Sequence, residues 1–179
     1  MPDVKRASKF LSLVLRHQPQ VANVTLDAQG WVPIDALIAG SNGRLDRASI
    51  DAAVADNDKQ RFGVSADGKR IRARQGHSIP VDLSLVPERP PQFLYHGTNV
   101  KAYGRIEIEG LKKMDRQHVH MATETSTAVT VGMRQGSAVV IRIEALAMHH
   151  AGFEFFKSEN GVWLTDHVPA QFLQGLEVG

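Results

Sequence analysis

The sequence predicts an α+β protein of two lobes, with a winged-helix-like N-terminal lobe of about 80 residues. Three observations support this fold class. In the first half, apolar residues recur at helical spacing, and two strand-like runs rich in lysine and arginine follow around a hairpin turn. Four of the eight prolines fall between Pro80 and Pro91. The second half alternates short strand-like runs with helical ones, which is typical of a mixed α and β lobe.

The first half begins with helices. Apolar residues recur at helical spacing over residues 4–17, which predicts an amphipathic helix. This helix is expected to end before Pro19, because the residue preceding a proline is disfavoured in helix. A turn and a short helix are expected over residues 30–40, and a further helix over residues 45–57 with Asp46 as its N-cap.

A basic hairpin is expected next. Two strand-like runs flank Asp67-Gly68 within residues 61–74, and this dipeptide is typical of a tight hairpin turn. The stretch from Lys59 to Arg74 holds six basic residues and one acid. Such a patch can bind a phosphate backbone, although a solvated strand face explains the same charges equally well.

A proline-rich linker, residues 81–92, is expected to divide the chain, because prolines at this density exclude regular helix and strand. The last lobe, residues 93–179, is expected to mix helices with short strands. The expected elements are a strand at 92–97, a helix at 99–111, a strand at 118–122, a helix at 126–136, a strand at 137–143 and a hairpin turning at Asn160-Gly161.

The bulk composition is that of an ordinary globular protein, with 42% hydrophobic and 22% charged residues and a net charge of +2. The chain has no cysteine, which excludes disulfides and thiolate metal sites. No apolar run reaches the ~18 residues of a membrane span, and the first residues lack the apolar core of a secretory signal. We therefore expect a cytoplasmic protein without a membrane partner.

Several polar motifs could carry chemistry, and each also has a structural explanation. Arg16-His17 and Arg134 lie at expected helix C-termini, where the helix dipole alone favours cations. The motif YHGT, residues 95–98, places an imidazole and a hydroxyl beside a glycine that lets a ligand approach the backbone. The same motif is equally compatible with an ordinary turn between a strand and a helix.

Metal and nucleotide motifs give weaker signals. His118 and His120 share one face of a strand, but no third ligand lies nearby, so we expect no metal site. No Walker lysine loop, G-x-S-x-G or G-x-G-x-x-G motif occurs. A Rossmann or P-loop nucleotide site is therefore not expected.

Together these stretches resemble one family, the NAD-dependent RNA 2′-phosphotransferases known from tRNA splicing. The matching stretches occur in order and span nearly the whole chain. They are SKFLSLVLRH (8–17), GWVPIDALI (30–38), DNDKQRFGVS (56–65), IRARQGHSI (71–79), LYHGT (94–98), HVHMA (118–122), VGMRQGSAVVIRI (131–143) and FFKSENGVWLTDHVP (155–169).

The resemblance implies that residues 1–80 form a winged-helix-like RNA lobe. It implies that residues 93–179 form an ADP-ribosyltransferase-like mixed α/β lobe that binds NAD. It also implies an Arg-His-Arg-Arg active site, supplied by both lobes. By motif position the four residues are Arg16, His17, Arg61 and Arg134. Planar guanidinium groups suit a phosphate dianion, because they stay charged and bind it bidentately.

The resemblance also implies an NAD site. Related ADP-ribosyltransferases carry a His-Tyr-Glu triad, and this family resembles a His-His-Val version, here His96, His120 and Val162. The complete implied set is His96, Gly97, Thr98, Arg116, His118, His120 and Val162, with Arg116 and His118 as weaker candidates for the pyrophosphate. Ala122 stands where the family often has a serine, so we expect altered NAD contacts there.

The implied reaction removes an internal 2′-monophosphate from RNA in two steps. The phosphate attacks the NAD ribose carbon that bears nicotinamide and forms RNA-2′-phospho-ADP-ribose. The ribose 2″-hydroxyl then attacks the phosphate, which releases 2′-OH RNA and ADP-ribose 1″,2″-cyclic phosphate. NAD is consumed as a co-substrate, and no metal is implied. We assign charge stabilisation to Arg61 and Arg134 and acid–base work to His17, since the unperturbed histidine pKa is about 6.5.

Alternatives remain open from the sequence. An enzyme could stop after the first step and ADP-ribosylate a terminal phosphate of RNA or DNA, which would fit the same pocket. A winged-helix nucleic-acid-binding regulator could sense NAD through its C-terminal lobe, and it would not need Arg134. A protein-modifying ADP-ribosyltransferase is disfavoured, because Val162 replaces the glutamate. For the favoured reaction the expected partners are a tRNA-like RNA bearing a 2′-phosphate and NAD, and we expect a monomer.

Overall fold

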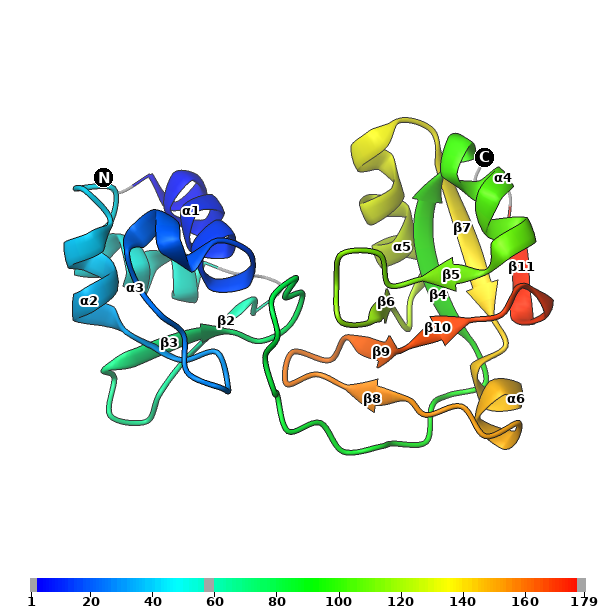
Figure 1. Ribbon diagram of the computed structural model, residues 1–179. Coiled ribbons are helices and arrows are strands. Elements are labelled where there is room, and N and C mark those ends of the chain that lie inside the picture. Colours follow the sequence, from blue (N-terminus) through cyan, green and yellow to red (C-terminus); the bar gives the residue numbers. More distant parts are fainter. Residues whose placement is uncertain (1–2, 57–59, 177–179) are drawn as a thin grey trace. The chain divides into compact units, whose positions relative to one another are not determined.

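The computed structural model describes residues 3–56 and 60–176, so Lys59, where the expected basic stretch begins, lies outside the described residues. The chain divides into two compact units, residues 1–84 and 85–179 (Figure 1). Each unit has its own hydrophobic core. Both units combine helices with small antiparallel sheets, which confirms the predicted α+β class.

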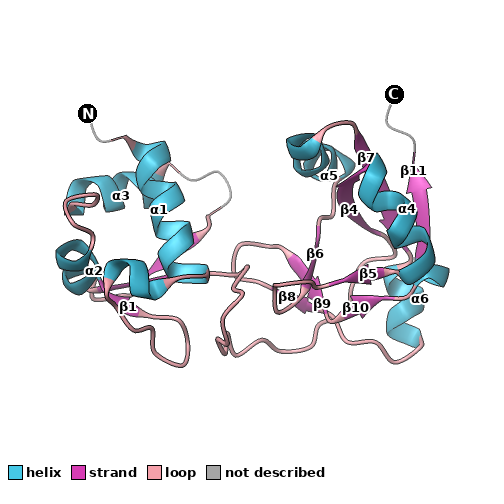
Figure 2. Cartoon of the chain, turned by 45° about the horizontal axis from the view of Figure 1, so that its top comes forward, coloured by secondary structure: helices cyan, strands magenta, loops and turns pink. Residues whose placement is uncertain are grey.

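The principal helices of the first unit begin where the sequence predicts. Helix α1 (Val4–Arg16) follows Asp3, whose carboxylate accepts a hydrogen bond from the backbone N–H of Arg6. Helix α3 (Arg47–Ala55) follows Asp46, the predicted N-cap, which forms a reciprocal capping box with Ser49. The remaining helical elements, seen in Figure 2, are a 3₁₀ turn η1 (Pro19–Ala22) and α2 (Ile34–Gly40).

The first unit contains one three-stranded sheet in the order β1-β3-β2, built from β1 (Val32–Pro33), β2 (Phe62–Val64) and β3 (Arg70–Ala73). The β2–β3 hairpin turns at Asp67-Gly68 as predicted, and Gly68 adopts a φ of +70° there. Helix and strand residues share one core. Its fully buried side chains include Leu11, Leu15, Ile34, Leu37, Ile50, Phe62 and Ile71.

The segment after β3 returns to the end of α1. The backbone N–H of Ser78 donates to the carbonyl of Arg16 at 2.9 Å, and the N–H of Asp82 donates to the carbonyl of Ala28 at 2.8 Å. This segment has no helix or strand of its own. Its position therefore depends on these hydrogen bonds and on the side chains that it buries.

His77 is the buried polar side chain of that segment, with 1% of the residue exposed. Burial, and then the positive charges of Arg16, His17 and Arg72, lower the pKa of His77 to about 4. The imidazole is consequently neutral at physiological pH. It fills space beside the guanidinium of Arg16 without adding a charge to it.

A second three-stranded sheet forms the centre of the second unit, in the order β11-β7-β4. Its strands are β4 (Leu94–Asn99), β7 (Ala138–Ile143) and β11 (Leu173–Leu176). Helix α4 (Val100–Glu109) follows β4 directly, because Asn99 caps it through the N–H of Ala102. The predicted strands at 92–97 and 137–143 and the predicted helix at 99–111 are thereby confirmed.

Helix α5 (Thr125–Gly132) packs on β4 and β7, as Figure 1 shows. The sequence predicts one helix to Gly136, and this prediction is wrong at its end. The chain tightens after Gly132 into a 3₁₀ turn η2 (Met133–Gln135), so that it can enter β7 at Ala138.

Further short strands complete the second unit. The three-stranded sheet β6-β9-β8 is formed by β6 (Val119–Met121), β9 (Trp163–Thr165) and β8 (Phe156–Lys157). The β8–β9 hairpin encloses the predicted Asn160-Gly161 turn. Tyr95 and Ala122 exchange two backbone hydrogen bonds of 2.8 Å, which join β4 to β6.

The sequence analysis did not predict several short elements. They are η1 and β1 of the first unit, and β5 (Leu111–Lys112), α6 (Ala145–His150), β10 (His167–Val168), η3 (Ala170–Phe172) and β11 of the second. A two-residue strand such as β5 is too short to show a period of two, and its pairing with β10 comes from a distant part of the chain.

Residues 81–92, the expected linker, contain no helix or strand. Within residues 3–56 and 60–176, none of the helices combines the length and the apolar character that crossing a membrane requires.

Gly97 lets α5 approach the backbone of β4. A Cβ at Gly97 would lie 1.7 Å from the carbonyl oxygen of Ala128, which is a backbone atom of α5. Gly132 makes a second close approach, because its Cβ would lie 2.6 Å from the carbonyl oxygen of Thr98. Neither contact leaves room for a methyl group, so the helix and the strand touch through their backbones.

We predict that Gly97→Ala destabilises the protein by about 3 kcal/mol, because α5 must move away from β4. Gly104→Ala is the matched control, since this exposed glycine of α4 has nothing within 4 Å of its Cβ position. We expect Gly104→Ala to stabilise the protein by up to about 1 kcal/mol through helix propensity. Urea unfolding of the two variants measures both effects, and equal stabilities would contradict the packing argument.

We predict that His77 makes stability fall at acid pH. The pKa of His77 is about 4 in the folded chain against 6.5 for a model histidine, so the unfolded chain takes up the proton first as the pH falls. The contribution of the neutral His77 ring to the free energy of unfolding is complete above pH ~6.5. It is lost as the pH falls towards ~4, and the total loss is about 3 kcal/mol.

The test compares unfolding free energies of the wild type, His77→Leu and His77→Gln across this pH range. Both substitutions should flatten the pH dependence, although they differ in polarity and in their stability at neutral pH. If the unfolding free energy of both variants depends on pH as steeply as that of the wild type, groups other than His77 cause the dependence.

Candidate active site

Arg16 and His17 stand at the C-terminal end of α1. His17 is the C-cap residue, and its backbone N–H still donates to the carbonyl of Leu13. Arg16 is half-buried, and its guanidinium lies against the backbone of Gly76. A Cβ at Gly76 would lie 3.5 Å from Cζ of Arg16, and Gly76 has a φ of +88°. A glycine thus forms the wall beside this arginine.

Ser78 contacts the side chain of His17. Nδ1 of His17 lies 2.8 Å from Oγ of Ser78, and the same Oγ lies 3.4 Å from the carbonyl oxygen of Arg16. The structure therefore brings Arg16 and His17 together with the turn at residues 76–78. His17 itself is exposed, which leaves its ring accessible to a substrate.

Arg61 is placed by the hairpin of the first unit. It immediately precedes β2, and its carbonyl accepts a hydrogen bond of 2.9 Å from the N–H of Arg74. Its side chain is half-buried. The register of the β2–β3 pair therefore fixes the point from which the Arg61 guanidinium extends.

His96 lies on β4 of the second unit, where its surroundings favour the neutral ring with the proton on Nδ1. Nδ1–H of His96 donates to the carbonyl oxygen of His120 at 2.8 Å, since a carbonyl can only accept. Desolvation lowers the pKa of His96, and the Arg116 charge lowers it further against the opposing effect of this hydrogen bond. The neutral ring thus has an unprotonated Nε2.

His120 is contacted by Arg116, which the resemblance gave only as a weaker candidate. Nη1 of Arg116 donates to Nδ1 of His120 at 3.0 Å, so the neutral imidazole carries its proton on Nε2. Partial burial, and then the charge of Arg134, lower the pKa of Arg116. Arg116, His120 and Arg134 therefore form a cationic cluster, which we call the Arg116 cluster. In the part of the chain that the structure describes, neither arginine of this cluster forms an ion pair with a carboxylate.

The other expected NAD residues are dispersed through the second unit. Gly97 faces α5, and Thr98 follows it on β4 beside Gly132. His118 packs edge-on against the ring of Phe156 at 5.7 Å, and burial lowers its pKa. Val162 lies in the β8–β9 turn, where its N–H donates to Oγ of Ser158 at 3.1 Å.

Ala122, the position where the family often has a serine, has a structural role through its backbone. It carries the two hydrogen bonds to Tyr95 that join β4 to β6. These bonds hold the strand of His96 beside the strand of His120. Any amino acid with a backbone N–H can form them, so they explain the strand pairing and not the choice of alanine.

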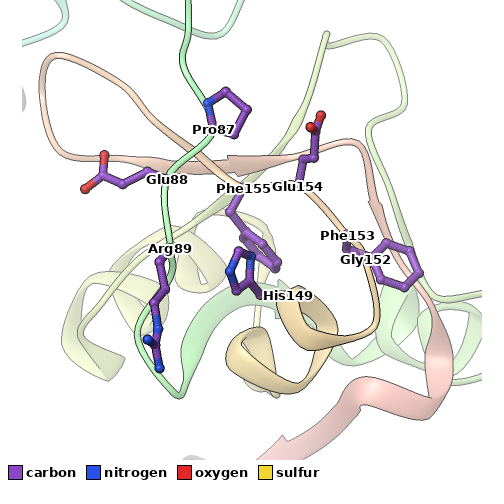
Figure 3. A pocket seen from close by; sticks show the side chains of 8 residues that line it. All are labelled: Pro87, Glu88, Arg89, His149, Gly152, Phe153, Glu154 and Phe155. Carbon is purple, nitrogen blue, oxygen red and sulfur yellow. The ribbon is translucent and has the colours of Figure 1, made fainter.

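A surface pocket of roughly 250 Å³ lies in another part of the second unit (Figure 3). Its lining is formed by Pro87, Glu88, Arg89, His149, Gly152, Phe153, Glu154 and Phe155. None of the predicted site residues lines it. The N–H of Glu88 donates to the carbonyl of Phe155 at 2.8 Å, which ties the start of this unit to its wall.

Sequence analysis missed the turn at residues 76–78 as part of the site. The residues lie in a stretch that matches the family, but no role was assigned to them. Ser78 is 61 residues from His17, and no local spacing indicates that the two side chains meet. The available signal was a glycine followed by two polar residues, three positions after the end of β3.

Comparisons with known proteins give the family. The family model described as RNA 2′-phosphotransferase, Tpt1 / KptA family, matches residues 2–167. A probable RNA 2′-phosphotransferase of Burkholderia lata is 48% identical over 180 residues, which cover 98% of this chain and 93% of that protein.

Two further relatives carry the same description. The protein of Pseudomonas aeruginosa PAO1 is 52% identical over 171 residues, covering 93% of this chain and 94% of the relative. That of Flavobacterium johnsoniae is 47% identical over 173 residues, covering 95% of both chains. With a family model that spans most of its length and relatives at about half identity, this chain belongs to the RNA 2′-phosphotransferase, Tpt1 / KptA family of enzymes.

Proposed function

We propose that the chain removes an internal 2′-monophosphate from RNA and transfers it to NAD. The products are RNA with a free 2′-OH, nicotinamide and ADP-ribose 1″,2″-cyclic phosphate. The observation that carries the proposal is the Arg116 cluster, in which Arg116 donates to His120 at 3.0 Å and the charge of Arg134 acts on the Arg116 guanidinium. Like charges held together are most stable with an anion between them, and phosphate and pyrophosphate are such anions.

NAD fits the Arg116 cluster by its charge. Its pyrophosphate would be held by Arg116, while Thr98 and the backbone of Gly97 would contact the ribose or adenine side of NAD. His118, His120 and Val162 complete the proposed NAD-binding residues. NAD would supply a ribose carbon from which nicotinamide leaves when the phosphate oxygen bonds to it. The neutral His96 offers Nε2 as a hydrogen-bond acceptor for a ribose hydroxyl.

The RNA phosphate is assigned to the arginines and to His17. Arg16 lies against the backbone of Gly76, so the turn at residues 76–78 limits the directions in which its guanidinium can extend. Arg61 and Arg134 would stabilise the charge that develops on phosphorus in the second step. His17 would accept the proton of the attacking 2″-hydroxyl and return it to the departing 2′-oxygen of the RNA.

The lobes follow from the same proposal. We assign residues 1–80 to a winged-helix-like RNA lobe, 81–92 to a linker and 93–179 to an ADP-ribosyltransferase-like NAD lobe. The element order and the β1-β3-β2 sheet of the first unit support the first assignment. We further propose that the protein acts as a cytoplasmic monomer on a tRNA-like substrate without a metal.

The decisive assay uses a short RNA with one labelled internal 2′-phosphate, incubated with and without NAD. We expect NAD-dependent transfer of the label to a small ADP-ribosyl product. An ADP-ribosylated RNA that accumulates as the end product would overturn the second step. It would favour an enzyme that modifies phosphates without removing them, and terminal phosphates of RNA or DNA would then be the next substrates to test. RNA binding without any reaction would favour a regulator that senses NAD.

The arginine assignments can be tested in the same assay. Three variants test them: Arg16→Ala, Arg61→Ala and Arg134→Ala. Each should lower the rate of phosphate removal by about 10²-fold or more, because each removes a positive charge that would stabilise the transferred phosphate. Arg105→Ala, at an exposed position of α4, is the control and should keep the wild-type rate. Near-normal rates in all three variants would refute the assignment.

His17→Ala should slow the second step more than the first, because the RNA phosphate is already ionised and needs no base for its initial attack. We expect about a 10²-fold loss in the second step and a build-up of RNA-2′-phospho-ADP-ribose. Rapid-quench sampling of the labelled RNA measures both steps. Equal slowing of the two steps would argue that His17 binds the phosphate and does not move the proton.

A further inference from the structure

We propose that Ser78 is a positioning residue for His17, which it holds so that Nε2 is the nitrogen that gains and loses the proton. The inference rests on the proposed function, because it deepens the role assigned to His17. It starts from the hydroxyl of Ser78, which lies 2.8 Å from Nδ1 of the His17 ring.

The backbone holds the Ser78 hydroxyl in place. The N–H of Ser78 donates to the carbonyl of Arg16, which is the residue directly before His17. The backbone of Ser78 is therefore bonded to the peptide unit that joins Arg16 to His17. The positive φ of Gly76 allows this tight return, and the buried His77 side chain anchors the segment from within the unit.

The hydrogen-bond inventory selects one arrangement for acid–base work. The Ser78 hydroxyl has one hydrogen, which it can donate either to Nδ1 of His17 or to the carbonyl oxygen of Arg16, 3.4 Å away. If it donates to Nδ1, the neutral ring carries its proton on Nε2 and Nε2 cannot accept another. If it donates to the carbonyl, Nδ1–H donates to Oγ, and Nε2 can accept a proton and release it.

The second arrangement also suits both charge states of His17. The bond from Nδ1–H to Oγ exists in the neutral ring and in the imidazolium, so the ring need not turn during the reaction. The carbonyl of Arg16 already accepts from the Ser78 N–H, and its second lone pair is available for the hydroxyl. Ser78 thus holds the exposed His17 ring by its Nδ1 and leaves Nε2 as the nitrogen that exchanges the proton.

The first test compares step rates of the full chain carrying Ser78→Ala, Ser78→Thr or Ser65→Ala. Ser78→Ala should slow the second step about tenfold, with the KM for RNA within about twofold of the wild type. Ser78→Thr keeps the hydroxyl and should restore most of the rate. Ser65→Ala is the matched control, because Ser65 also donates a side-chain hydrogen bond, to Asp67, at a half-buried position of the same unit.

The second test reads the ring directly and does not depend on catalysis. ¹⁵N NMR of the histidine-labelled protein distinguishes the two ring nitrogens, and His17→Gln assigns the signals. We expect a protonated Nδ1 in the neutral His17 ring of the wild type and of Ser78→Thr, and a shift towards the Nε2–H form in Ser78→Ala.

Two results would overturn the inference: unchanged His17 ¹⁵N shifts in Ser78→Ala, or a second-step rate in Ser78→Ala equal to that of Ser65→Ala. Absence of NAD-dependent phosphate removal in the wild type would instead refute the proposed function. In that case the NMR result still decides whether Ser78 controls the His17 ring.

Discussion

The backbone contact between α5 and β4 is the constraint on which the candidate site of the second unit depends. Gly97 and Gly132 bring the helix and the strand within reach of each other's carbonyl oxygens. His96 precedes Gly97 by one residue, and Arg134 follows Gly132 by two. A packed interface transmits position rigidly, because it offers no spare volume in which either element can shift. The two glycines thereby fix the backbone near His96 and Arg134, two residues that are distant in sequence.

Electrostatics then determines what such a site can hold. Arg116 and Arg134 cannot relieve their repulsion by losing a proton, because a guanidinium stays charged at any physiological pH. His120 receives a hydrogen bond from Arg116 on Nδ1 and so adds no charge in its neutral form. In the proposed reaction the phosphate nucleophile is already ionised, so its attack needs positive charge that binds it more than a base. Under this proposal Val162 can stand where related ADP-ribosyltransferases carry a glutamate, because no base has to activate the phosphate.

Sequence predicted the fold where the signals are local. The caps at Asp46, the turn at Asp67-Gly68 and the periodicity of α1 each lie within one element, and each is confirmed. The end of α5 and the two-residue pair β5–β10 depend on tertiary contacts, so their bounds could not be derived from spacing. The same limit applies to the site. Strand alternation grouped His118 with His120, yet His118 lies against Phe156 while His120 is joined to Arg116 and His96.

Both units place a neutral imidazole next to arginines, and this common feature explains why histidines accompany the cations. His77 lies near Arg16 and Arg72, and His96 lies near Arg116; burial lowers the pKa of both rings. A protonated ring at either place would repel the guanidinium beside it and would compete for the same anion. A neutral ring fills the space, makes directed hydrogen bonds where partners exist, and leaves the positive charge on the arginines. His17 differs because it is exposed and lies 2.8 Å from a hydroxyl, and it is the imidazole to which the proposed function assigns the proton transfer.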